Sequence, residues 1–227
     1  MNDMYSVSSA QIDERISFIR KTYAHLLGAV VAFIAIEYGL FATGVGWAVA
    51  ESMLSVSWLL VLGLFMGIGW LANWWAMKDT SPALQYAGLA LYVVAQAVIF
   101  VPLLAIAAMY SDPSVIPMAG VTTLIVFAGL TVAVFATKKD FSFLRTGLVV
   151  ATFLAMGAIV AAILFGFNLG LFFSIAMAGL ASGYILYYTS NVLHHYRPNQ
   201  HVAASLALFS AVALLFWYIL RIFMARD

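Results

Sequence analysis

Seven long apolar stretches follow one another along the chain, and they constrain its fold more than any other feature. A helix needs about 20 mostly apolar residues to cross about 30 Å of hydrocarbon. Charged residues make up only 8% of the chain, against about 25% in soluble domains, so most of the surface is expected to face lipid. The stretches are Tyr23–Thr43, Leu54–Trp75, Tyr86–Tyr110, Val115–Ala136, Gly147–Phe167, Leu169–Tyr188 and Val202–Phe223.

This pattern predicts an all-α integral membrane protein. A single seven-helix transmembrane domain, residues 23–227, follows a polar cytoplasmic N-terminal segment, residues 1–22. The break between the fifth and sixth helices is the weakest, because only Gly166, Asn168 and Gly170 mark it. One helix through both stretches would be about twice as long as the bilayer is thick, so two helices and a tight turn are predicted.

The lysines and arginines predict the orientation, since they favour the cytoplasmic side of a membrane. If the N-terminus is cytoplasmic, eight of these ten residues lie on the cytoplasmic side, and only Arg221 and Arg226 lie outside. We therefore predict a cytoplasmic N-terminus and a C-terminus on the outer side.

Composition and motifs exclude several classes of function. A net charge of +1 gives no case for nucleic-acid binding, and there is no cysteine. His194, His195 and His201 lack a carboxylate to complete a metal site, and adjacent histidines point apart on a helix, so no metal is predicted. Ser182 has no histidine in a later helix to activate it, residues 202–223 contain no lysine for a retinal Schiff base, and H-E-x-x-H is absent. We expect a protein that is not an enzyme and holds no cofactor.

Glu37 is the only acidic residue inside an apolar stretch. A charge in hydrocarbon is costly, which favours a functional role, here a proton-titrating or cation-attracting group that faces the bundle. The alternative is a carboxyl that reaches the nearby helix end or is kept neutral by a neighbour. The sequence leaves both interpretations open.

Two further groups of polar residues interrupt the apolar pattern. Gln96 lies in the third stretch with Pro102, which frees a backbone carbonyl and indicates either a wetted kink or a simple kink. Tyr188, Asn191 and His195 fall along one helical face at the end of the sixth stretch. They form the richest polar cluster in the chain, with an ordinary interfacial belt as the alternative.

Two pairs of glycines have the spacing of helix contacts. Gly63 and Gly67 lie four apart in the second stretch, and Gly179 and Gly183 lie four apart in the sixth. Small residues let helices approach closely in lipid. Both pairs therefore predict contacts within the bundle, with dimerisation as the alternative.

Particular strings in the chain resemble a known family. These are Phe18–Tyr23 (FIRKTY), Thr137–Leu144 (TKKDFSFL), Ile185–His194 (ILYYTSNVLH) and the end Ala225–Asp227. Together they resemble the Bax inhibitor-1 family, also called the transmembrane Bax inhibitor motif family, in its bacterial branch. The string that contains Lys138, Lys139 and Asp140 is the family loop motif.

The resemblance implies seven helices with the N-terminus inside, and two activities. Some members resemble pH-sensitive calcium leak channels, in which two aspartates near the cytoplasmic ends of the last two core helices share a proton and gate the path. Here those gate positions hold Tyr188 and Ser210, which do not titrate usefully near neutral pH. Arg145 and Thr146 also replace a frequent Gly-Gly after the loop motif.

Other bacterial members are associated with a membrane-anchored ATP-dependent protease and modulate its action on membrane proteins. We expect a protein of the bacterial inner membrane that acts through membrane protein partners in quality control. The alternative is a leak channel or transporter for calcium or another cation, with its gate altered at Tyr188 and Ser210 and with Glu37 as a candidate substitute group.

Overall fold

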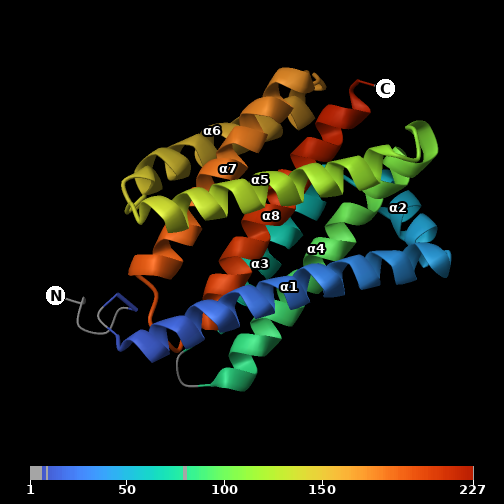
Figure 1. Ribbon diagram of the computed structural model, residues 1–227. Helices are drawn as coiled ribbons and strands as arrows, with labels where there is room; N and C mark the ends of the chain where they lie inside the picture. The colour runs from blue at the N-terminus through green and yellow to red at the C-terminus, as the bar shows by residue number, and fades with distance from the viewer. Residues whose placement is uncertain (1–6, 9, 79–80, 227) are drawn as a thin grey trace.

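The computed structural model describes residues 7–8, 10–78 and 81–226, and within those ranges the chain forms eight α-helices and no β-strand. Seven of the eight, all except α2, are long and apolar enough to cross a membrane. The predicted all-α fold with seven candidate spans is therefore confirmed. The helices are α1 (Ile12–Ala42), α2 (Val45–Ser55), α3 (Trp58–Ala76), α4 (Pro82–Tyr110), α5 (Val115–Thr137), α6 (Leu144–Phe165), α7 (Gly170–His194) and α8 (His201–Met224) (Figure 1).

The first helix extends further toward the N-terminus than the apolar stretch does. The predicted polar segment, residues 1–22, lies partly outside the described residues, and α1 begins at Ile12. Asp13 and Glu14 stand in its first turn, where carboxylates interact favourably with the helix dipole. Residues 12–22 are therefore the first turns of the helix that continues as the first span.

The weakly marked break between the fifth and sixth predicted helices is present. α6 ends at Phe165 and α7 begins at Gly170. Gly166 and Gly170 both have a φ of 71°, a left-handed conformation that glycine adopts without the steric cost of a Cβ. The amide of Gly166 donates to the carbonyl of Ala162 at 2.9 Å and so closes α6. One continuous helix through this region is excluded.

The short helix α2 is absent from the sequence prediction, which placed Leu54 at the start of the second span. In the structure Leu54 belongs to α2, and the span α3 begins at Trp58. Gly44, with a φ of 80°, allows the turn between α1 and α2. The eleven residues of α2 are too few to cross a bilayer, and Ala50 packs in a small cluster with Val101 of α4. The helix therefore covers one end of the bundle.

The core of the bundle lies around α4 and α8, the two spans with the largest buried share. α8 contacts α1, α3, α4, α5 and α7, and Figure 1 shows it running through the middle of the bundle. The rings of Phe33, Phe100 and Phe209 join α1, α4 and α8, with centroid distances from Phe33 of 5.2 Å to Phe100 and 6.2 Å to Phe209. Aromatic packing thus holds α1 on the buried central pair of α4 and α8.

α3 and α4 approach each other closely, and the approach depends on small residues. A Cβ added at Gly88 would lie 2.5 Å from the carbonyl oxygen of Ala72 and 2.8 Å from the amide nitrogen of Ala76. Ala72 and Ala76 are fully buried. Because small residues let backbones approach closely in lipid, this Ala-x-x-x-Ala face and Gly88 fix the packing of α3 on α4.

The predicted glycine contacts are only partly correct. A Cβ at Gly183 would lie 2.8 Å from Leu148 Cδ2 of α6, so Gly183 makes the expected helix contact. Gly63, Gly67 and Gly179 have open space where a Cβ would stand, and the prediction that they contact other helices of this chain is wrong. The α3 contact falls further along that helix, because the residues of α3 that face α4 are alanines.

The described chain starts and finishes at opposite ends of the bundle. In Figure 1, α1 begins at the end that also carries the α5–α6 and α7–α8 connections, whereas α8 finishes at the other end. An odd number of spans requires this arrangement. Which end faces the cytoplasm stays a prediction from the positions of the lysines and arginines.

Candidate functional site

A set of polar contacts joins the α5–α6 connection to the end of α7. The Ser190 hydroxyl accepts from the Phe141 amide at 2.8 Å and donates to Asp140 Oδ1 at 3.3 Å. Asp140 Oδ2 lies 2.9 Å from His195 Nε2, an ion pair when the imidazole is protonated. We call Asp140, Phe141, Ser190 and His195 the loop clasp. It brings together the two strings that carried the family resemblance most specifically.

Local backbone geometry presents Asp140 to the loop clasp. Lys138 ends α5 in a left-handed conformation, with a φ of 51°, and its amide donates to the carbonyl of Val134 at 2.8 Å. Asp140 Oδ1 then accepts from the Ser142 amide at 2.8 Å, an Asx turn. Lys138 and Lys139 are exposed. The motif lysines therefore terminate a helix, and the motif aspartate makes the link between helices.

The pKa of the Asp140 carboxyl reflects these contacts. Partial burial raises the pKa, and the hydrogen bond from the Ser142 amide and the interaction with His195 oppose it, so that the pKa lies below its usual value. Because both side chains are almost half exposed, 44% for Asp140 and 47% for His195, solvent screens the pair. The loop clasp is therefore a modest, pH-dependent contact.

The two gate positions line one cavity, of about 520 Å³, among α3, α4, α6, α7 and α8. The Ser210 hydroxyl donates to the carbonyl of Ala207 at 2.7 Å, and the ring of Tyr188 stacks on Tyr184 with a centroid distance of 5.5 Å. The described hydrogen bonds include none between Tyr188 and Ser210. The structure thus places these residues around one space without a direct bond between their side chains. We call this space the gate cavity.

The gate cavity carries polar groups but no carboxylate. Gln96 lines it, and the buried Oε1 atom of Gln96 has no hydrogen-bond partner among the described residues. Thr152 lines it too and shares a hydrogen bond of 2.8 Å with Tyr184. Arg221 is the charged residue of the lining. The cavity is polar enough for water, and the formal charge on its lining is positive.

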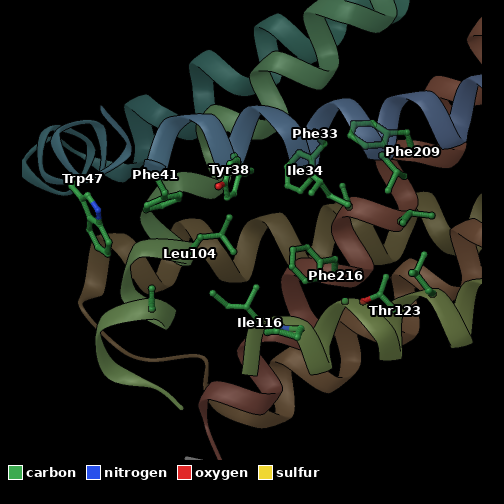
Figure 2. Close-up of a pocket in the computed structure, with 18 residues that line it drawn as sticks. Phe33, Ile34, Tyr38, Phe41, Trp47, Leu104, Ile116, Thr123, Phe209 and Phe216 are labelled. Atoms are coloured by element: carbon green, nitrogen blue, oxygen red, sulfur yellow. The ribbon is translucent and has the colours of Figure 1, made fainter. Parts of the chain in front are cut away.

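Glu37 lies in a different place, in a second cavity of about 540 Å³ bounded by α1, α4, α5 and α8 (Figure 2). Its side chain is 6% exposed, and neither carboxyl oxygen has a hydrogen-bond partner among the described residues. The sequence interpretation of a carboxyl that faces the bundle fits this position better than one that reaches water. Glu37 does not line the gate cavity with Tyr188 and Ser210.

The predicted polar face of α7 divides between two sites. Tyr188 lines the gate cavity and His195 belongs to the loop clasp. Asn191 is partly buried between them, and its backbone carbonyl accepts from the His195 amide at 2.8 Å and the Tyr196 amide at 3.0 Å. Asn191 therefore ends the helix and positions His195 through the backbone.

The three histidines considered for a metal make different contacts in the structure. The rings of His194 and His195 have centroids 6.2 Å apart. His201 instead packs against His25 of α1, with a centroid distance of 5.1 Å. His25 in turn bonds Tyr86 of α4, with 3.1 Å between Nε2 and the hydroxyl oxygen. This cluster joins α1, α4 and α8.

Sequence reasoning missed the role of Ser190 and the cluster of His25, Tyr86 and His201. Ser190 stands in the Thr-Ser-Asn string that the resemblance singled out, so a signal for it was present. The three residues of the cluster come from different helices, and no spacing along the chain connects them. Only the packing of the bundle brings them together.

Comparisons with known proteins support the family. The family profile described as "Inhibitor of apoptosis-promoting Bax1" matches residues 15–227. The chain is 30% identical over 213 residues to Bax inhibitor 1 of Schizosaccharomyces pombe, and the aligned residues make up 92% of this chain and 76% of the yeast protein. It is 25% identical over 219 residues to protein lifeguard 4 of Mus musculus, covering 95% and 87% of the two chains.

A bacterial relative matches over a shorter length. An uncharacterised protein of Pseudomonas aeruginosa is 34% identical over 111 residues, which are 48% of this chain and 50% of that protein. The profile, by contrast, extends over nearly the whole chain and includes the loop clasp, both gate positions, six candidate spans in full and the first from residue 15 onward. The chain therefore belongs to the Bax inhibitor-1 family.

Proposed function

We propose that this protein is a non-enzymatic member of its family that acts by binding other membrane proteins in a bacterial inner membrane. The observation that carries the proposal is the gate cavity. Tyr188 and Ser210 stand where the resemblance implies a proton-sharing aspartate pair, and Arg221 is the charged residue of the lining. Calcium sites usually include carboxylate oxygens among their ligands. The gate cavity has none, which argues against calcium conduction.

An exposed face of α3 supports a role in binding other membrane helices. Gly63, Gly67, Trp70 and Trp74 follow one another at spacings of four, three and four residues and therefore lie on one helical face. All four are exposed, and the two indole rings stack with a centroid distance of 6.3 Å. Small residues beside large flat ones let a partner helix approach closely. The resemblance to bacterial members makes a membrane-anchored ATP-dependent protease the partner to test first.

The test is purification of the tagged protein from its own membranes in a mild detergent. We expect the protease to co-purify, and we expect Gly63→Leu together with Gly67→Leu to reduce its yield at least about tenfold, a loss of about 1.4 kcal/mol of binding. The matched control is Gly157→Leu on α6, another exposed glycine with open space around it. Equal yields from both variants and the wild type would overturn the role of α3, and absence of the protease would remove it as the partner.

A cation leak is the second candidate, and the volume of the gate cavity favours it. The alternative predicts that purified protein in liposomes passes calcium, and that restoring two carboxylates by Tyr188→Asp and Ser210→Asp increases the flux. Partner binding without conduction predicts tight liposomes for the wild type. A wild-type flux well above that of empty liposomes would contradict the proposal.

A further inference from the structure

The second cavity contains a carboxyl group with no bonding partner among the described residues. The Glu37 side chain is 6% exposed, and its two oxygens have no hydrogen-bond partner among the described residues. The lining includes no lysine, arginine or histidine. A buried charge without a partner is costly, and so is a buried polar group without a hydrogen bond. The described lining therefore supplies neither an ion-pair partner nor a hydrogen bond to this carboxyl.

The neighbouring polar groups do not supply that partner. The hydroxyl of Thr123 lines the same cavity but donates to the carbonyl of Ala119 at 2.7 Å. Tyr38 and Trp47 also line it, yet neither is bonded to Glu37, since both carboxyl oxygens lack a partner. The unused hydrogen-bonding capacity of Glu37 therefore calls for a donor, and a positively charged donor complements it best.

The rest of the lining is complementary to a ligand that has an apolar body and a cationic head group. Figure 2 shows Phe33 and Phe41 of α1 on one side, Ile116 and Thr123 of α5 on the other, and Phe216 of α8 between them. Aromatic rings attract an ammonium group through their faces. A volume of about 540 Å³ lies within the range of about 300–1,000 Å³ that is usual for small-molecule sites.

The cavity opens toward lipid between α1 and α5. Its margin includes Ile34, Tyr38 and Leu124, whose side chains are 58%, 76% and 54% exposed. Glu37 lies five residues before the end of α1 at Ala42, which places it about 7.5 Å from the helix end at 1.5 Å per residue. An amphiphile in the bilayer with its head near the membrane surface could bring that head to the depth of Glu37.

We propose that this groove between α1 and α5 binds a lipophilic primary ammonium compound, whose head pairs with Glu37 and whose apolar part packs among the aromatic rings. The site is separate from the gate cavity and from the exposed face of α3. Its existence does not depend on whether the protein binds a protease or conducts ions.

The test is photolabelling of the purified full-length protein in lipid nanodiscs, with labelled residues mapped by mass spectrometry. The probe is a dodecylammonium that carries a diazirine in its chain, compared with the matching dodecanol. We expect the ammonium probe to label residues of α1 and α5 around the groove at least about tenfold more than the alcohol does. Equal labelling by the two probes would show a general acyl-chain groove and would overturn the proposal.

Two variants and one control assign the effect to the groove. Glu37→Gln keeps the shape of the side chain and should lower labelling by the ammonium probe to the level of the alcohol. Glu51→Gln removes an exposed carboxylate on α2 and should change nothing. Gly120→Leu places a side chain in open space on the groove wall. It should reduce labelling by the ammonium probe although Glu37 itself is unchanged. Full labelling of either groove variant would overturn the proposal, and the Gly120 variant keeps it testable if Glu37→Gln fails to fold.

Discussion

Asp140 and His195, fifty-five positions apart in the chain, meet with 2.9 Å between Oδ2 and Nε2. Their contact links the α5–α6 connection to the end of α7. Ser190 adds a second link through the Phe141 amide. Two of the strings that mark the family therefore act together, because both hold one end of α6 against α7. This matters because α6 is the span with the smallest buried share.

Asp140→Asn should lower the stability of the protein modestly. Exposed ion pairs contribute about 0.2–1 kcal/mol, and both partners here are close to half exposed. We expect a melting temperature in detergent that is lower by a few degrees. Asp112→Asn is the matched control, because Asp112 makes the same local bond to an amide two residues ahead, Ser114, at 2.8 Å. A larger effect at Asp112 than at Asp140 would contradict the importance of the loop clasp.

The contribution of Asp140 should also depend on pH in a defined direction. The pKa of its carboxyl is lowered in the folded protein by the bond from the Ser142 amide and by His195, against the opposing effect of burial. A lowered pKa stabilises the fold above the unfolded value, about 3.9, and the stabilisation is lost as the pH falls through the folded value. The difference in melting temperature between wild type and Asp140→Asn should therefore shrink in acid below about pH 4. A difference that grows in acid would refute the assignment.

Ser190→Ala should destabilise the protein more than Asp140→Asn does. The Ser190 side chain is fully buried, and its removal leaves the Phe141 amide without its acceptor, at a cost of about 1–3 kcal/mol. Ser182→Ala on the same helix is the control, since its hydroxyl bonds only the carbonyl of Ala178 among the described contacts. Thermal unfolding followed by tryptophan fluorescence measures both. Equal melting temperatures for the two variants would contradict the role of the Ser190 hydroxyl as the acceptor of the Phe141 amide.

Gly88→Ala should disrupt the packing of α3 on α4. The added methyl carbon would stand 2.5 Å from a backbone carbonyl oxygen, which cannot rotate away as a side chain can. Overpacking of this kind costs about 1–3 kcal/mol. Gly69→Ala is the control, because there the methyl would meet Tyr92 at an ordinary 3.5 Å and alanine favours the helix. A Gly88→Ala protein as stable as wild type would show that the two backbones are further apart.

Lys138→Gly should stabilise the protein. Lys138 has a φ of 51°, and the left-handed conformation costs a residue with a Cβ about 1–2 kcal/mol. Glycine relieves this strain, but it also increases the conformational entropy of the unfolded chain. We therefore expect the free energy of unfolding to rise by less than about 1 kcal/mol. Lys139→Gly removes a neighbouring charge without relieving a positive φ and should give no gain. Measurement of both melting temperatures separates strain from charge.

The length and polarity of the apolar stretches were enough to predict the seven spans, because the bilayer sets a minimum length for each. They were not enough to predict α2, because eleven residues carry no comparable constraint. Glycine spacing identified Gly183 but failed for Gly63 and Gly67. Spacing shows which residues share a helical face and does not show which face meets a neighbour.

For the candidate sites too, the sequence indicated individual residues but not how they are arranged in space. The loop motif singled out Asp140 and the polar face of the sixth stretch singled out His195, but their contact depends on how the α5–α6 connection returns to α7. The position of Glu37 past the middle of its helix was visible in the sequence. That it lies apart from Tyr188 and Ser210, in a separate cavity, follows from the packing of α1 and α5 on α8, for which no motif exists.

The central place of α8 has a consequence for how the protein is made. This helix follows the other seven in the chain, yet it occupies the axis that they surround. While the chain is being synthesised, α1, α2 and α3 can pack on α4 once it is inserted, but the contacts of α8 with α1, α5 and α7 form only after the last helix has entered the bilayer. We therefore expect the bundle to reach its final packing only after α8 has been inserted.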